Sequence, residues 1–147
     1  MTRPTCEDFA AAAAALEGVR YRPRGRSAET GLDCAGIVHA PARAIGITDL
    51  PDRTDYDPFM PDPEMLRQLC REGMEETGIV DSGTGRVGLC CWEGQVEARH
   101  LVVMLPKRKI VHVDATYRRV TRVSASWLGS KLVAVFRLRG VDYGEPW

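Results

Sequence analysis

The sequence predicts an α+β fold in which N-terminal helices pack on an antiparallel β-sheet. Helix-favouring segments fill the first half of the chain, and short runs rich in Val, Leu and aromatic residues take over from Arg86 onward. Helices first and strands afterwards are typical of α+β domains. A chain of 147 residues is expected to form a single domain spanning 1–147, long enough to bury its own core.

Three segments of the first half favour helix. Thr5 and Asp8 resemble a capping box before an alanine-rich run over 6–16, which Gly18 ends. A second helix is expected from about Cys34 to Ile45, with a kink or an early end at Pro41. Asp62 and Pro63 have the residue types of an N-cap and a first helical position, so a third helix should start there.

Short runs of β-favouring residues in the second half predict five strands. Their approximate ranges are 86–92, 96–105, 109–114, 117–123 and 131–138. Between the second and third helices, the Asp- and Pro-rich segment 49–61 is expected to be a long surface loop.

Composition excludes several classes of partner. Twenty basic and twenty acidic residues cancel, so the charge gives no reason to expect nucleic acid or a membrane surface as a partner. No apolar run reaches the length of a membrane span, and the N-terminus lacks the apolar region of a secretion signal. The five cysteines are odd in number and show no C-x-x-C spacing, so neither a zinc site nor a disulfide framework is expected. Four of them are expected to be small buried hydrophobes: Cys6, Cys70, Cys90 and Cys91.

Cys34 differs because a turn places it at the start of the second helix. It lies within Gly31-Leu32-Asp33-Cys34-Ala35-Gly36-Ile37-Val38. Backbone N–H groups and the helix dipole at such a position favour a thiolate, so we expect a lowered thiol pKa and a reactive nucleophile.

Two histidines are expected to share one face of a hairpin. His100 lies in the strand before a turn at Pro106, and His112 lies in the strand after it. A hairpin centred on Pro106 places the two histidines directly opposite each other, about 5 Å apart at Cβ. Centring on Lys107 instead places His100 opposite Asp114 and diagonal to His112. Both registers give His100 a polar partner, which is His112 in one case and Asp114 in the other.

These motifs together resemble a known family. The segment 31–38 closely resembles the nucleophile motif of the NlpC-type, papain-like cell-wall cysteine peptidases, and 100–104 and 110–112 resemble the two strands that carry the family's polar residues. Gly25-Arg26-Ser27 and the segment 127–137 resemble the branch associated with phage tails. The sequence departs from the family pattern around Tyr21, at Ala35, and in the strand before His100, where no Asp is present.

The resemblance implies an enzyme that hydrolyses an amide bond in peptidoglycan stem peptides, with no metal and no cofactor. It assigns Cys34 as nucleophile, His100 as base and His112 as the residue that orients His100. Tyr21 and Asp33 are expected to contact the substrate or its oxyanion. The family resemblance implies bacterial peptidoglycan as a partner. The phage-like segments imply tail hub or fibre proteins as further partners, and a virion tail or phage-like particle, acting in the host cell wall or periplasm, as the location.

Other interpretations share these residues. A tail-tip adaptor could keep the fold without activity, and an acyltransferase or an antibacterial effector could use the same Cys and His chemistry. The loop 49–61 could serve as a docking surface or lid through Tyr56, Phe59 and Met60. Alternatively, these three side chains fold back onto the domain's own core.

Overall fold

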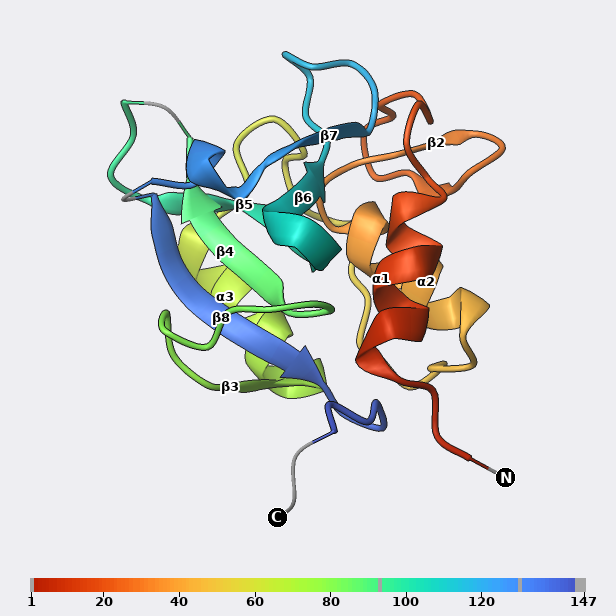
Figure 1. The fold of residues 1–147 in the computed structure, drawn as a ribbon. Helices are drawn as coiled ribbons and strands as arrows, with labels where there is room; N and C mark the ends of the chain where they lie inside the picture. Colours follow the sequence, from red (N-terminus) through yellow and green to blue (C-terminus); the bar gives the residue numbers. More distant parts are fainter. Residues whose placement is uncertain (1, 93, 130, 145–147) are drawn as a thin grey trace.

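The computed structural model describes residues 2–92, 94–129 and 131–144 and has an α+β architecture (Figure 1). Its longest elements are three helices and a sheet of six antiparallel strands. The predicted fold class is therefore confirmed. No helix in the described part of the chain is both long enough and apolar enough to cross a bilayer.

The three helices form at the predicted places. Helix α1 spans Cys6–Ala14 and starts with the predicted capping box between Thr5 and Asp8. Helix α2 spans Gly36–Ala44 and continues for three residues beyond Pro41, so of the kink or early end expected at that proline, the early end does not occur. Helix α3 spans Pro63–Gly73, and the Asp62 side chain accepts the Glu64 N–H as its N-cap. The segment 49–61 contains no helix or strand, as predicted.

The large sheet has the strand order β3-β8-β4-β5-β6-β7. Its strands are β3 (Met74–Glu76), β4 (Val87–Cys91), β5 (Ala98–Leu105), β6 (Lys109–His112), β7 (Thr121–Ser124) and β8 (Leu132–Leu138). The predicted strand 117–123 begins later than expected, because Asp114 to Arg118 form a turn closed by the Arg118 N–H on the Asp114 carbonyl. Strand β3 was not predicted, and neither was the small hairpin of β1 (Arg26–Ser27) and β2 (Gly31–Leu32).

The β5–β6 hairpin has the register centred on Lys107. Val103 pairs with Val111 and Leu105 pairs with Lys109, with a short 3₁₀ turn η1 (Pro106–Arg108) between the strands. Of the two registers that the sequence left open, this is the one that brings His112 diagonally across from His100.

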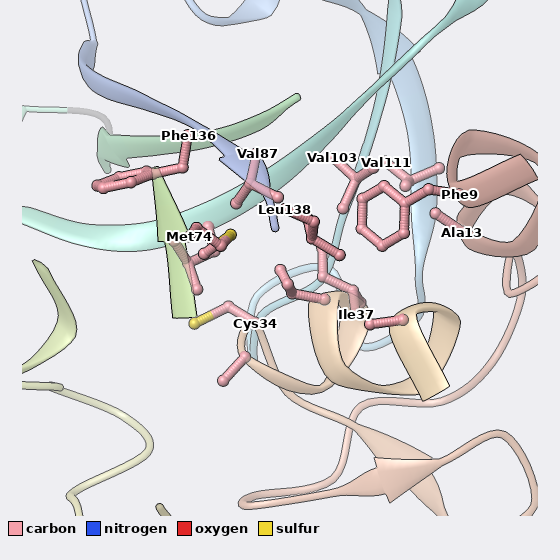
Figure 2. Packing of buried hydrophobic residues seen from close by; sticks show 14 of the residues in the cluster. Phe9, Ala13, Cys34, Ile37, Met74, Val87, Val103, Val111, Phe136 and Leu138 are labelled. Atoms are coloured by element: carbon pink, nitrogen blue, oxygen red, sulfur yellow. The ribbon is translucent and has the colours of Figure 1, made fainter. Parts of the chain in front are cut away.

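The two faces of the sheet are covered differently. Helices α1, α2 and α3 share one hydrophobic cluster with alternate residues of the strands, among them Leu101 and Val103. Figure 2 shows Phe9 and Ala13 of α1 next to Val103 and Val111, with Ile37 of α2 and Cys34 in the same cluster. The strand residues between those of the first cluster, such as Val102 and Met104, point to the opposite face of the sheet. There they form a second, smaller cluster with the 3₁₀ turn η2 (Ala125–Trp127). This second face carries the histidines.

Candidate active site

The turn that carries Cys34 is held by close backbone approach. Leu32 ends β2, Cys34 lies in the turn that follows, and α2 starts at Gly36. A Cβ at Gly36 would collide with the carbonyl oxygen of Gly25, so only glycine lets the β1–β2 hairpin lie this close to the helix start. Cys34 thus lies two residues before α2 and is 6% exposed.

The carboxylate of Asp33 ties this turn together. One oxygen accepts the N–H groups of Ala35 and Gly36 at 3.1 and 2.9 Å and binds the Arg26 guanidinium at 2.8 Å. The other accepts the Arg24 N–H at 3.1 Å and the Tyr56 hydroxyl. With Asp33 only 1% exposed and both oxygens bonded, its structural role is to fix the turn that carries Cys34.

The expected lowering of the Cys34 pKa is wrong for this structure. Burial raises the pKa of the Cys34 thiol well above its usual range, and the adjacent Asp33 carboxylate raises it further. A hydrogen bond from the Leu101 N–H to the sulfur lowers the pKa of Cys34, but by less than burial raises it. The expectation considered the helix start alone, whereas burial of the sulfur and the Asp33 carboxylate, which binds the first N–H groups of the helix, both disfavour the thiolate.

The two histidines are brought together as the sequence suggested. The His100 Nε2 and the His112 Nδ1 lie 2.9 Å apart in a hydrogen bond, and both side chains are fully buried. Burial lowers the pKa of His100 to about 3, and burial also lowers the pKa of His112, with the Asp114 carboxylate opposing the latter shift. Both rings are therefore neutral near pH 7.

Asp114 does not take the place of His112. Although the register sets Asp114 opposite His100, the ring of His100 bonds to His112, and one Asp114 oxygen accepts the N–H groups of Thr116 and Tyr117, both at 2.9 Å. One ligand atom each from His100, His112 and Asp114 lie within 4.8 Å of one another, so these three are the described residues best placed to hold a metal ion. In this arrangement, however, the two facing ring nitrogens bond to each other.

Cys34 lies close to the β5 backbone beside His100 but forms no hydrogen bond with that histidine among the described residues. The thiol belongs to the helix-side cluster, and the histidine rings adjoin the opposite face next to η2. The turn that carries Cys34 meets β5 at Leu101, one residue beyond His100, and the Leu101 N–H is directed at the sulfur. The His100 Nδ1, which faces away from His112, is buried without a hydrogen-bond partner. It is therefore available to receive a proton.

Aromatic side chains cover the histidine pair. The ring of His112 lies 4.4 Å from the ring of Tyr117 and 4.5 Å from that of Trp127, and His100 lies 6.0 Å from both Trp92 and Trp127. The Trp127 indole donates to the Tyr117 hydroxyl at 3.1 Å, which holds the cover together. Access to His100 therefore requires one of these rings to move.

Tyr21 lies beside the strand that leads into the Cys34 turn. Its backbone bridges to Leu32, and its buried hydroxyl has no hydrogen-bond partner in the described structure. Burial raises the pKa of Tyr21 to about 12, and the nearby Asp33 carboxylate adds to the shift. Tyr21 therefore keeps its proton and can donate it in a hydrogen bond.

The loop 49–61 divides into an anchored part and an exposed part. Tyr56 is 9% exposed and folds back onto Asp33 and Arg26, whereas Phe59 and Met60 are 57% and 48% exposed. Phe59 leans on Tyr21, with ring centroids 6.2 Å apart. Together with residues of the aromatic cover, these two rings line a cavity of about 480 Å³, whose walls are Tyr21, Pro58, Phe59, Trp92, Asp114, Ala115, Thr116, Tyr117 and Trp127.

Several residues of this region could not be singled out from the sequence. Trp92 belongs to no motif, and Trp127 was noted only as the start of the phage-like segment 127–137, although the scarcity of tryptophan, with three in the chain, was a weak signal. Arg26 was noted only within Gly25-Arg26-Ser27, and its arginine-rich surroundings over 20–26 are typical of a solvated loop, yet its side chain is 12% exposed and binds Asp33 and Asp52. All five cysteines are free and buried.

Solved structures resemble this fold over nearly its whole length. The NlpC/p60 domain of the peptidoglycan hydrolase SagA has a TM-score of 0.67 and 14% identity, covering 91% of this chain and 99% of that one. An NlpC/p60 family protein from Bacillus cereus has a TM-score of 0.68 and 17% identity, covering 93% of this chain but only 41% of its own.

RipD from Mycobacterium tuberculosis, described as a non-catalytic NlpC/p60 domain protein adapted to peptidoglycan binding, has a TM-score of 0.60 and 14% identity over 90% of this chain and 95% of its own. No family model and no curated protein sequence matches the chain. The resemblance seen in the segment 31–38 is therefore confirmed at the level of structure: this protein has the NlpC/p60 fold.

Proposed function

We propose that this protein is a cysteine peptidase that hydrolyses an amide bond in the stem peptides of bacterial peptidoglycan. The observation that supports this most is the buried hydrogen bond between His100 and His112, formed on the strand against which the Cys34 turn packs. A neutral imidazole with one ring nitrogen bonded to a partner and the other free has the arrangement of a general base. The fold shared with peptidoglycan hydrolases favours the substrate class.

The proposed reaction starts from a neutral thiol and a neutral imidazole. The free His100 Nδ1 takes the Cys34 proton as the sulfur attacks the substrate carbonyl, because the raised pKa of the thiol leaves little thiolate beforehand. The His100 Nε2–H group donates a hydrogen bond to the His112 Nδ1. This bond holds the His100 ring in place and stabilises the imidazolium that forms on His100. Because no hydrogen bond joins Cys34 to His100 within the described residues, the proposal requires the Cys34 thiol to move toward the His100 Nδ1 when substrate binds.

Two donors are available for the negative oxygen of the tetrahedral intermediate. The Cys34 N–H donates to no acceptor within the described residues, and the Tyr21 hydroxyl is likewise unpaired. Each such donor typically contributes about 3 kcal/mol to the transition state. Collapse of the intermediate breaks the C–N bond, and His100 returns the proton to the leaving amine. Water then hydrolyses the Cys34 thioester, which yields a free carboxylate and restores the thiol.

A second candidate is a peptidoglycan-binding or adaptor protein without activity. Both histidines are fully buried, and no hydrogen bond joins Cys34 to His100 within the described part of the chain. A neighbour of the same fold is described as non-catalytic. These observations fit a site that binds glycopeptide without cleaving it.

Digestion of purified sacculi separates the two candidates. Wild-type protein should release peptide fragments with new amine and carboxylate ends, identified by mass spectrometry, and Cys34→Ala should release none. Transfer of the acyl group to an added amine in place of water would identify an acyltransferase. Binding of wild-type protein to sacculi without release of fragments would favour the adaptor.

We further propose that phage tail hub or fibre proteins carry this domain to the host cell wall. The support is the phage-like character of Gly25-Arg26-Ser27 and 127–137 in the sequence. The exposed Phe59 and Met60 are candidate contacts. Mass spectrometry of purified tailed particles should detect this chain, and Met60→Ser should reduce its incorporation. Absence of the chain from such particles would contradict this location.

A further inference from the structure

The guanidinium of Arg26 joins two parts of the chain that are distant in the sequence. Its Nη1 binds the Asp33 carboxylate at 2.8 Å, whereas its Nε and Nη2 bind the loop 49–61. The partners in the loop are the Asp52 carboxylate at 2.9 Å, the Arg53 carbonyl oxygen at 2.9 Å and the Tyr56 hydroxyl at 3.0 Å. Arg26 therefore ties a long loop to the turn that carries Cys34.

Tyr56 makes the same connection from the side of the loop. Its hydroxyl donates to the Asp33 Oδ2, while Arg26 binds the Oδ1 of the same carboxylate. Burial raises the pKa of the Tyr56 hydroxyl, and the charge of Asp33 raises it further, so the hydroxyl keeps its proton and remains a donor. The loop therefore holds one oxygen of Asp33 directly and the other through Arg26.

The charge of Asp33 makes these contacts relevant to Cys34, the next residue in the chain. Burial raises the pKa of the Cys34 thiol most, the Asp33 carboxylate raises it further, and the positive charge of Arg26 lowers it. Among the described residues, Arg26 is the only side chain that forms an ion pair with Asp33. The two side chains are 12% and 2% exposed, so water is poorly placed to screen the carboxylate if the guanidinium is removed.

We propose that Arg26 is a positioning residue for Cys34, which neutralises the Asp33 carboxylate beside the thiol and fixes the turn against the loop 49–61. Tyr56 supports it as the second contact between the loop and Asp33. The anchored part of the loop thereby holds the nucleophile in place. The effect of Arg26 on the reactivity of the thiol is independent of any substrate, whereas its effect on catalysis rests on the proposed function.

Alkylation of Cys34 by iodoacetamide tests this role on the full chain without requiring activity. Peptide mapping by mass spectrometry gives the rate at pH 8.5, with the other four cysteines as internal references. Arg26→Gln should slow alkylation of Cys34 about fivefold, because the charge of Asp33 is no longer neutralised and less thiolate is present. Arg26→Lys keeps the positive charge and should stay within about twofold of the wild-type rate. A residue that only stabilised the turn would show the opposite change, because a loosened turn exposes the buried thiol.

Tyr56→Phe is the second variant, because it removes only the hydroxyl and keeps the ring. It should slow alkylation of Cys34 about twofold, since Asp33 loses one donor but keeps Arg26. The matched control is Arg53→Gln, which removes an arginine of the same loop whose side chain is 49% exposed and paired with Asp55. The Arg53 carbonyl that Arg26 binds is unchanged in this control, so the rate should equal that of the wild type.

Alkylation of Arg26→Gln at the wild-type rate or faster would overturn the proposal, as would an equal loss in Arg26→Lys. If Arg26→Gln does not fold, an unchanged or faster rate in Tyr56→Phe would overturn it. In cleavage of a stem peptide, Arg26→Gln should lower kcat about fivefold and leave KM unchanged, because Arg26 does not line the cavity beside the histidines. Slower alkylation of Arg26→Gln, in a protein whose wild type cleaves no peptide, would refute the proposed hydrolase and leave the role of Arg26 standing.

Discussion

Replacing Asp33 with Asn should destabilise the fold more than any exposed charge substitution. Asn keeps one oxygen for the Ala35 and Gly36 N–H groups, but its NH2 group faces the Arg24 N–H and the charge that pairs with Arg26 is lost. The side chains of Arg26 and Asp33 are 12% and 2% exposed, so an unpaired guanidinium would remain in a poorly solvated place. Breaking a buried pair in this way typically costs about 3–5 kcal/mol.

The lower end of that range, about 3 kcal/mol, is expected here because Arg26 retains a second partner. That partner is Asp52, 2.9 Å away and 30% exposed. Domains of this kind unfold with roughly 5–15 kcal/mol, so the loss is a large fraction of the total. Urea unfolding at pH 7, followed by circular dichroism, measures it as a shift in midpoint at constant slope.

Asp55→Asn is the matched control, since Asp55 forms an ion pair with Arg53 in which both side chains are well exposed. It should leave the unfolding midpoint unchanged within error, because exposed pairs contribute little. A loss below about 1 kcal/mol for Asp33→Asn would refute the view that this carboxylate holds the nucleophile turn.

The remaining predictions concern protonation and catalysis. Burial lowers the pKa of His39 to about 4 and that of His100 to about 3. Between pH 6.5 and about 4 the unfolded chain therefore binds more protons than the folded chain, and the free energy of unfolding should fall as the pH is lowered through that window. In urea unfolding from pH 7 to 4.5, His39→Gln should reduce the slope of unfolding free energy against pH by up to about 1.4 kcal/mol per pH unit. An unchanged slope would show that the pKa of His39 is the same in the folded and unfolded chain. Alkylation of Cys34 by iodoacetamide should accelerate up to at least pH 9, and a plateau below pH 7 would reveal a thiolate that the structure does not predict. His100→Ala should abolish release of fragments from sacculi. His112→Ala should leave measurable activity, because water can partly replace a group that only orients His100. Activity that survives His100→Ala but is lost in His112→Ala would show that His112 is the base and His100 the orienting residue.

Local sequence patterns were sufficient to predict most of the fold. The capping box at Thr5, the Asp62-Pro63 helix start and the runs of β-favouring residues each depend on neighbours in the chain, and each appears in the structure. Strand β3 could not be predicted, because Met74–Glu76 is strand only through pairing with β8, sixty or more residues away. Pairing of that kind leaves no local signal.

The meeting of His100 and His112 was predictable from the sequence, but the pKa of Cys34 was not. The spacing of His100 and His112 allowed two registers, and only the three-residue turn around Lys107 decided between them. A lowered pKa for Cys34 followed from the helix start alone. Burial and the Asp33 carboxylate reverse that expectation, and both are properties of the folded surroundings.

The most direct test of the central claim is to trap the covalent intermediate. Wild-type protein mixed with a stem-peptide substrate and quenched in acid should show an intact mass increased by the acyl fragment, and peptide mapping should place the thioester on Cys34. Cys34→Ala should show no adduct. An adduct on Cys90 or Cys91, or fragments released by wild-type protein and Cys34→Ala alike, would contradict the claim that Cys34 and the His100–His112 pair form the active site.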